Sequence, residues 1–150
     1  MTPTFIVDTR EQKPYSEVFD RLGHKYNFHA LPVGDYSLAG YEQVFSLERK
    51  SLGDLIDSVT RDRERFEREL ERAKAYKYFA VIIECSFFDI VNHNYISQIA
   101  PNTLLSIIFH WNVKYNIPFL FVESRSGGAL AVIKMSQAFL KYHGDENAEY

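Results

Sequence analysis

Short apolar runs that alternate with helix-like segments constrain the fold of this chain more than any other feature of its sequence. FIVD (5–8), FAVIIE (79–84) and PFLFVE (118–123) each have the length of a buried strand. Residues 25–38 and 41–50 alternate apolar and polar side chains, as further strands do. Segments with helical patterns lie between and after these strands, at 14–23, 52–59, 61–78, 102–116 and 127–143. Strands interleaved with helices predict an α/β fold with a central mixed β-sheet flanked by helices.

The length and composition are those of one globular domain. The chain has 150 residues, of which 46% are hydrophobic and 15% aromatic, enough to bury a core. We expect a single domain over residues 1–143, with irregular structure at 87–101, followed by a polar C-terminal tail at 144–150. No apolar run approaches the roughly 20 residues that span a bilayer, so no membrane contact is expected.

Charge and cysteine content narrow the class of function. The formal net charge is -3, so any contact with a polyanion must come from a local basic patch. The single cysteine, Cys85, lies in an apolar run and has no partner for an internal disulfide. The N-terminus lacks the basic and apolar regions of a signal peptide. These features favour a cytoplasmic, reducing environment, with nucleoid association if the source is bacterial.

Two of the expected strands sort their side chains cleanly if they pair as a hairpin. When 35–39 pairs with 44–48 so that opposed residue numbers sum to 83, apolar residues gather on one face. Asp35 then faces Glu48 on the other, polar face. Because side chains alternate along a strand, Lys50 shares that polar face with Glu48.

Two carboxylates directly opposed across a ladder repel each other, so this register predicts a compensating cation. Asp35 and Glu48 would bind Mg²⁺ directly, and the backbone carbonyl of Arg49 would add a ligand. Asp8, at the end of the first strand, would supply a third carboxylate, directly or through water. Lys50 would orient or deprotonate an attacking water, or stabilise the charge that builds on a phosphate.

The start of the following helix carries another charged residue. Ser51 and Asp54 have the spacing of a capping box, and the helix dipole favours an anion in the first turn. Residues 48–50 also allow a plainer interpretation, a solvated strand end, with Asp54 serving only as part of the cap. The residue pattern alone leaves both interpretations open.

These residues resemble the motifs of the XPF-type nuclease domain, which XPF and Mus endonucleases and the archaeal Hef nuclease share. That family has Asp-x-Arg-Glu after an apolar strand, then Gly-Asp, then Glu-Arg-Lys followed by Asp after three residues. The matching residues here are Asp8, Arg10, Glu11, Gly34, Asp35, Glu48, Arg49, Lys50 and Asp54, with Arg65 and Glu84 further along. The resemblance extends over roughly residues 4–140.

The resemblance implies a restriction-endonuclease-like fold and Mg²⁺- or Mn²⁺-dependent hydrolysis of DNA phosphodiester bonds. It implies metal binding at Asp35 and Glu48, catalysis by Lys50, and a role for Arg49 in assembling the site. The full catalytic set that it implies is Asp8, Asp35, Glu48, Arg49, Lys50 and Asp54. The implied substrate is branched or otherwise structured DNA, as handled in repair and recombination.

The chain departs from the XPF and Mus pattern at both ends. No tandem helix-hairpin-helix module follows the last expected helix, and no helicase domain precedes the first strand. We therefore expect either a homodimer or a separate partner to supply specificity for DNA structure.

A stripe of arginines lies on the helix predicted at 61–78. Arg61, Arg65, Arg68 and Arg72 are spaced i, i+4, i+7 and i+11, so they share one side of that helix. A DNA-binding edge beside the catalytic residues would use this stripe together with Arg10. The alternative is a solvated helix whose arginines pair with neighbouring carboxylates.

Three functions follow from these observations. The leading one is a metal-dependent DNA endonuclease. The alternative is a catalytically inactive DNA-binding or scaffold member of the same family. The third is a protein-interaction domain in which the charged motif has no catalytic role.

Overall fold

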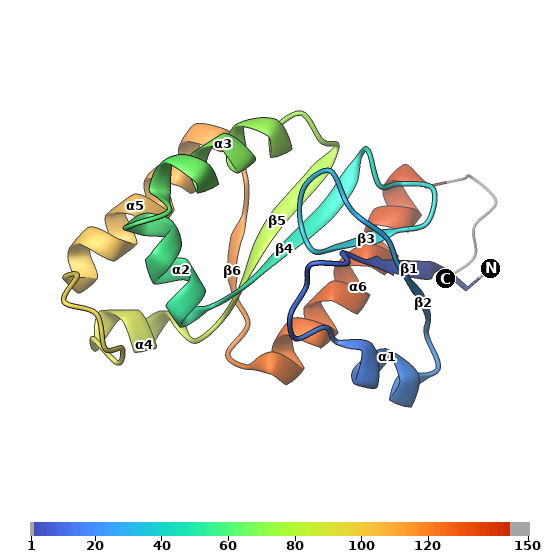
Figure 1. Cartoon of the computed structure of the whole chain (residues 1–150), viewed down its shortest axis with the longest axis horizontal. Coiled ribbons are helices and arrows are strands. Elements are labelled where there is room, and N and C mark those ends of the chain that lie inside the picture. Colours follow the sequence, from blue (N-terminus) through green and yellow to red (C-terminus); the bar gives the residue numbers. More distant parts are fainter. Residues whose placement is uncertain (1, 145–150) are drawn as a thin grey trace.

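A six-stranded mixed β-sheet with helices on both faces organises the chain in the computed structural model, which describes residues 2–144 (Figure 1). The strand order is β2-β1-β3-β4-β5-β6. β3 runs antiparallel to both of its neighbours, and the other pairs are parallel. The elements are β1 Thr4–Val7, α1 Ser16–Leu22, β2 Lys25–Phe28, β3 Tyr36–Leu38, β4 Phe45–Ser51, α2 Leu52–Val59, α3 Arg63–Ala73, β5 Tyr78–Glu84, α4 Phe87–Val91, α5 Pro101–Tyr115, β6 Phe119–Phe121 and α6 Arg125–His143.

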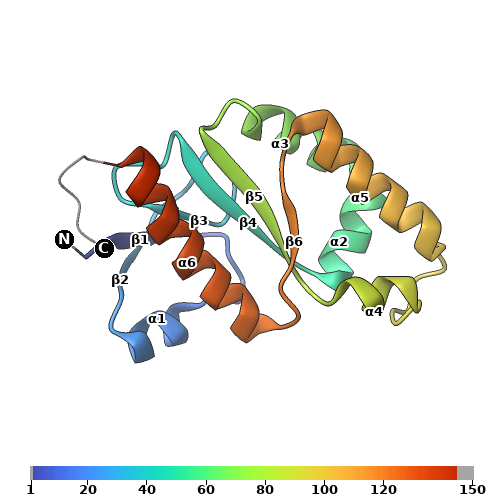
Figure 2. The same ribbon diagram turned by 180° about the vertical axis from the view of Figure 1, so that it is seen from behind.

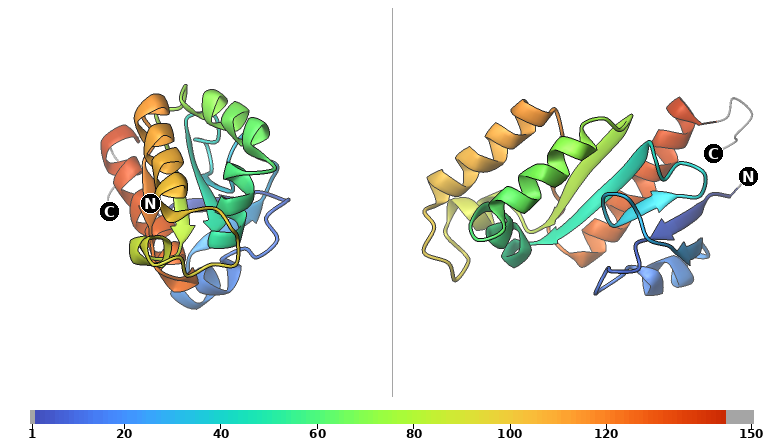
Figure 3. Two further views of the ribbon diagram at one scale, coloured as in Figure 1. Left: turned by 90° about the vertical axis from the view of Figure 1, so that its left-hand side faces the viewer. Right: turned by 45° about the horizontal axis from the view of Figure 1, so that its top comes forward.

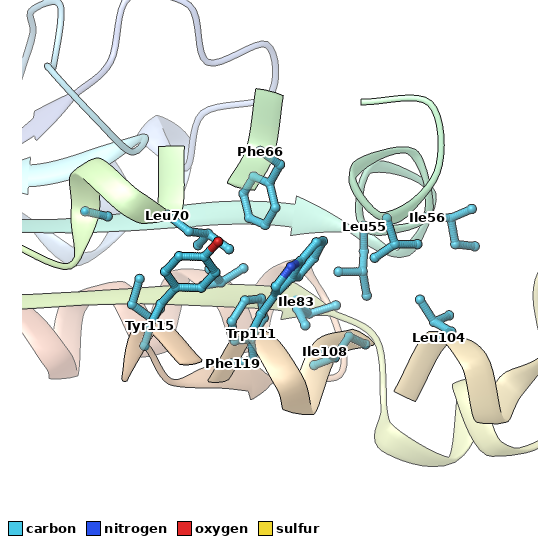
Figure 4. Close-up of a cluster of buried hydrophobic side chains, with 14 of the residues drawn as sticks. Leu55, Ile56, Phe66, Leu70, Ile83, Leu104, Ile108, Trp111, Tyr115 and Phe119 are labelled. Atoms are coloured by element: carbon cyan, nitrogen blue, oxygen red, sulfur yellow. The ribbon is translucent and has the colours of Figure 1, made fainter. Parts of the chain in front are cut away.

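The sheet separates two apolar cores. On one face, α2, α3 and α5 bury a cluster that includes Leu55, Phe66 and Trp111 (Figures 1 and 4). On the opposite face, α1 and α6 bury a ring-rich cluster that includes Phe19 and Phe139, and Figure 2, seen from the reverse side, shows α6 crossing in front of the sheet. The end-on view in Figure 3 shows the helices on the two sides. This layered arrangement confirms the predicted α/β fold.

The hairpin formed by β3 and β4 has the predicted register. Tyr36 pairs with Leu47, and the two numbers sum to 83. The paired part of β3 is shorter than predicted, and β4 begins at Phe45 and ends at Ser51, one residue beyond the strand predicted at 41–50. Ser51 then caps α2 in a capping box with Asp54, as predicted. α2 therefore begins directly after β4, with no loop between the strand and the helix.

Two helix predictions need correction. The segment predicted as irregular contains α4, whose capping box joins Ser86 and Asp89. The helix predicted at 61–78 is α3, which is shorter at both ends, and a turn separates it from Thr60, the C-cap of α2. Arg61 therefore lies in the turn between the two helices. Within residues 2–144, no helix has the length and apolar character needed to cross a bilayer. The predicted tail lies outside the described residues except for Gly144.

A glycine in α6 lets Tyr15 reach the end of β5. The Tyr15 hydroxyl donates a 3.0 Å hydrogen bond to Glu84 Oε2, and a Cβ at Gly128 would overlap that hydroxyl. We expect Gly128→Ala to displace Tyr15 and lower the free energy of unfolding by about 1–3 kcal/mol, the usual cost of overpacking. Urea denaturation followed by circular dichroism measures this.

Gly53→Ala is the matched control. Gly53 also lies in a helix, but its added Cβ would meet only Ser51 Oγ at 3.8 Å, an ordinary contact. This variant should unfold at the same urea concentration as the wild type or a higher one, because alanine favours the helix. Equal stability losses in both variants would mean that the Tyr15 contact is unimportant.

Candidate active site

Two carboxylates come together where the chain enters β3 and in the middle of β4. Asp35 N donates a 2.8 Å hydrogen bond to Leu47 O, and Arg49 N donates a 2.7 Å hydrogen bond to Asp35 Oδ2. The hairpin backbone therefore holds both the Asp35 backbone and the Asp35 carboxylate in place. Glu48, between those two β4 residues, is 7% exposed, and its carboxyl group interacts directly with that of Asp35. The opposed pair expected from the register is thus formed.

Burial and mutual repulsion make this pair costly to ionise. Burial raises the pKa of Asp35 to about 6, and the nearby negative charge of Glu11 adds to the shift. Burial also raises the pKa of Glu48 well above its usual value, with the charge of Asp35 as the next cause. Without a cation, both carboxyl groups therefore bind protons more readily than free carboxyl groups do.

These shifts predict a pH dependence of stability for the metal-free protein. Because both folded-state pKa values are raised, the pair contributes its full stability below about pH 4 and loses it as the pH rises through about 6 and above. The free energy of unfolding in EDTA should fall between pH 5 and pH 8, by an amount on the order of 2 kcal/mol. Urea titrations at several pH values measure it. Glu48→Gln is the control and should flatten the curve, whereas an unchanged slope would contradict the assignment.

Lys50 lies on the same polar face, as predicted. Its Nζ is 3.7 Å from Glu48 Oε2, and its side chain is 12% exposed. At that separation the two groups attract electrostatically without a hydrogen bond. The Lys50 ammonium therefore lies next to the carboxylate pair with its donors available to a ligand.

Asp8 lies at the end of β1, where its carboxylate is fully occupied. It accepts hydrogen bonds from the Arg10 backbone and side chain and from the Leu31 backbone. Burial by itself would raise the pKa of Asp8, but the hydrogen bonds from Arg10 and Leu31 outweigh it and lower the pKa. The structure places Asp8 on the cavity wall, where it fixes Arg10 in position.

Arg49 points to the opposite face of the sheet. Its guanidinium bonds Glu84 at 2.7 Å and Glu11 at 3.2 Å, and all three side chains are at least 92% buried. Burial alone lowers the pKa of Arg49, but the two carboxylates raise it overall. The guanidinium also lies 5.4 Å from the centre of the Tyr15 ring. The side chain of Arg49 thus connects β4 to β5 and to the loop after β1, on the face of the sheet opposite to the carboxylate pair.

A cavity of about 320 Å³ opens beside the pair. Three of the predicted arginines of α3 lie on its wall, together with Asp35, Glu48 and Lys50. A second hollow of about 590 Å³ adjoins it and includes Arg61 and Asp54. Asp54 uses one carboxylate oxygen to cap α2, accepting from Ser51 N at 3.2 Å. The predicted site residues on the first cavity wall are Asp8, Arg10, Asp35, Glu48, Lys50, Arg65, Arg68 and Arg72.

The arginines differ in how they are engaged. Arg61 pairs with Asp57 at 3.0 Å, and Arg65 pairs with Asp62 at 3.3 Å. Arg68 and Arg72 form no salt bridge with any residue from 2 to 144. The two arginines farther along α3 are therefore the ones with free charge towards the cavity.

The residues present fit a divalent cation with few protein ligands. Within residues 2–144, no group of three or more His, Cys, Asp or Glu side chains has the geometry of a metal site. The protein offers the Asp35 and Glu48 carboxylates, and Mg²⁺ commonly takes one or two carboxylates plus waters and phosphate oxygens. Nearby, Glu11 Oε2 is buried and lacks a hydrogen-bond partner among the described residues. This excess of buried negative charge suits a cation.

Three further residues of the site were not in the predicted catalytic, metal-binding or DNA-binding sets. Glu11 and Glu84, which belong to the motifs quoted above, hold the Arg49 guanidinium, and Glu69 of α3 lies on the cavity wall. The position of Glu69, one residue after Arg68 and at the edge of the arginine stripe, could have indicated from the sequence that it lies near the site. The approach of Glu11 and Glu84 depends on tertiary packing, so spacing in the sequence gives no sign of it.

The sheet order, the flanking helices and the carboxylates on β3 and β4 define a restriction-endonuclease-like fold. The structure is similar to XPF from Aeropyrum pernix, with a TM-score of 0.74 and 22% sequence identity, covering 93% of this chain and 66% of that one. It is equally similar to XPF from Aeropyrum pernix in complex with DNA, with a TM-score of 0.74 and 22% identity, covering 97% and 68%. The chain thus spans about two thirds of the length of those proteins.

The sequence places the chain in a family. A family model of the ERCC4 domain matches residues 7–131, and the chain belongs to this family of structure-specific DNA nucleases. A search of curated proteins finds no significant match. The resemblance to XPF-type nuclease domains drawn from the motifs is thereby confirmed.

Proposed function

We propose that residues 1–143 form a single nuclease domain that hydrolyses phosphodiester bonds of branched or otherwise structured DNA, with Mg²⁺ or Mn²⁺ as cofactor. One observation carries this proposal: the carboxylates of Asp35, which is partly buried, and Glu48, which is buried, lie beside the Lys50 ammonium in a cavity walled by arginines. Membership of a DNA nuclease family supports it. Such a protein acts inside the cell, in the cytoplasm and at the nucleoid if it is bacterial.

Asp35, Glu48 and Lys50 have distinct roles in the proposed reaction. Asp35 and Glu48, with the Arg49 carbonyl, would hold the cation, which would activate water and neutralise charge at the scissile phosphate. Lys50 donates hydrogen bonds to the phosphate and stabilises the negative charge that develops there. Asp8 holds the Arg10 guanidinium towards the DNA backbone.

The supporting residues keep this arrangement in place. The Arg49 side chain anchors the β4 backbone to Glu11 and Glu84, so that the adjacent Glu48 and Lys50 keep their positions. Asp54 stabilises the start of α2 at the rim of the second hollow.

DNA is proposed to run along the arginine side of α3. Arg68 and Arg72, with free charge towards the cavity, would each neutralise one phosphate, while Arg10, Arg61 and Arg65 would extend the contact. The double variant Arg68→Gln/Arg72→Gln should bind duplex DNA more weakly, with the slope of log affinity against log salt reduced by about 1.8. Fluorescence anisotropy over a salt series measures this slope. Arg63→Gln is the control, because Arg63 pairs with Glu67 outside this cavity.

The cleavage test compares the wild type with Lys50→Ala on a panel of labelled DNAs with Mg²⁺ or Mn²⁺. Single-stranded, linear duplex, flap, fork and junction DNA make up the panel. The proposal predicts cleavage of at least one branched substrate by the wild type and loss of that cleavage in Lys50→Ala. Equal cleavage by both proteins would contradict it. DNA binding without any cleavage would favour the catalytically inactive scaffold member instead.

Specificity for DNA structure is proposed to need a second chain. A homodimer or a separate partner would hold the second arm of a branched substrate, because one cavity contacts one duplex. Sedimentation of the protein with and without fork DNA distinguishes these arrangements. A monomer that cleaves forks selectively by itself would rule out both.

A further inference from the structure

The ammonium of Lys50 lies over an aromatic ring. Its Nζ is 4.3 Å from the centre of the Phe66 ring, which α3 extends towards β4. The negative face of an aromatic ring attracts a cation at this distance. Phe66 belongs to the core under α2, α3 and α5, and its ring also contacts the lysine assigned to catalysis above.

Without the ring, Lys50 would be weakly fixed. Lysine has a flexible four-carbon stem, and Lys50 forms no hydrogen bond through its ammonium to any residue from 2 to 144. Its nearest charged neighbour is Glu48, with Oε2 3.7 Å away. Under the proposed function Glu48 is a cation ligand, so its attraction for Lys50 weakens when the site is loaded. The ring of Phe66 is then the remaining contact that holds the ammonium.

Phe66 itself is held rigidly. It is 3% exposed and packs edge-to-face on Trp111, with 5.2 Å between ring centres (Figure 4). The Trp111 indole in turn donates a hydrogen bond to Glu67, on the same helix as Phe66. The ring is therefore fixed by α5 and by its own helix, independently of Lys50.

We propose that Phe66 is a positioning residue, which holds the Lys50 ammonium at the mouth of the cavity through the face of its ring. This inference rests on the proposed function of Lys50. A ring attracts a cation without supplying a hydrogen-bond acceptor, so Phe66 fixes the ammonium while leaving its donors available to phosphate. Because Phe66 lies between Arg65 and Arg68 on α3, one rigid helix presents both the DNA-binding arginines and the contact to Lys50.

Fluorination of the ring provides the test, because it weakens the attraction for a cation with little change of shape. With 3,4,5-trifluorophenylalanine in place of Phe66, we expect kcat for DNA cleavage to fall by about 3- to 30-fold, with KM unchanged. Monofluorination should give a smaller decrease. The same fluorinated residue at Phe79 is the matched control. Phe79 is buried in the same core but lies near the start of β5, whereas Lys50 pairs with Ile83 near the end of that strand. Equal rates for the two fluorinated proteins would overturn the proposal.

A readout without catalysis separates this inference from the proposed function. In protein labelled with ¹³C at the lysine ε position, the Lys50 ε protons should be shifted upfield by the ring, and Phe66→Leu should remove that shift. Retention of the shift in Phe66→Leu would overturn the proposal even if the enzyme is active. If the wild type cleaves no DNA, the proposed function fails, and the spectra still decide whether Phe66 holds Lys50.

Discussion

Glu48→Gln should cleave DNA at least about 10³-fold more slowly than the wild type, because the cation that it helps to bind supplies several kcal/mol at the transition state. The same change should make the metal-free protein more stable at pH 8. It removes one of two repelling carboxylates, each with a raised pKa, from a buried position. A single substitution would thus lower the cleavage rate and raise the stability of the metal-free protein.

Single-turnover cleavage and urea denaturation in EDTA measure the two effects. Glu64→Gln, on α3 but outside both cavities, is the control and should change neither. A Glu48→Gln protein that is both inactive and less stable than the wild type at pH 8 would mean that Glu48 is an ordinary structural residue. A fully active one would remove Glu48 from the site altogether.

Arg49→Met should destabilise the fold by about 3–5 kcal/mol, the usual cost of leaving buried charges without a partner. Glu11 and Glu84 both depend on this guanidinium, and each is more than 90% buried. For a domain of this size the loss corresponds to a fall in Tm of roughly 6–20 °C. Scanning calorimetry measures it.

The triple variant Arg49→Met/Glu11→Gln/Glu84→Gln distinguishes lost attraction from stranded charge. With both carboxylates neutral, most of the stability should return, because no buried charge is left unpaired. If the triple variant is as unstable as the single one, packing of the arginine stem is the main contribution. Arg49→Lys keeps the charge but loses the two-pronged contact, and it should fall between the wild type and Arg49→Met.

The local part of the site could be predicted from sequence because it depends on alternation along two adjacent strands. The sum of 83 between opposed residues follows from sorting apolar side chains to one face, and it places Asp35 against Glu48. The observed pairing of Tyr36 with Leu47 agrees. The capping box at Ser51 is also local, and the structure contains it.

The remainder depends on packing between distant segments. The same alternation that gathers Glu48 and Lys50 sends Arg49 to the other face, but its partners come from the loop after β1 and from the end of β5. The parallel pairing of β4 with β5 aligns Ser51 with Glu84, and no turn sequence encodes that register. Contacts of this kind follow from the whole fold.

Short helices and helix ends were the weakest predictions. α4 has only five residues, too few for a hydrophobic period, although its Ser86–Asp89 capping box repeats the pattern that identified α2. The break before α3 places Arg61 in a turn, where it pairs with Asp57. The arginine stripe is consequently shorter than the spacing predicts, and its free charges lie at Arg68 and Arg72.

Isothermal titration of the metal-free protein with Mn²⁺ shows whether Asp35 and Glu48 form a cation site. We expect binding to the wild type at one site, with affinity that increases from pH 5 to pH 8 as Asp35 and Glu48 lose their protons. Glu48→Gln should show little or no binding under the same conditions. Absence of binding to the wild type, or equal binding to both proteins, would contradict the claim that this carboxylate pair is a cation site.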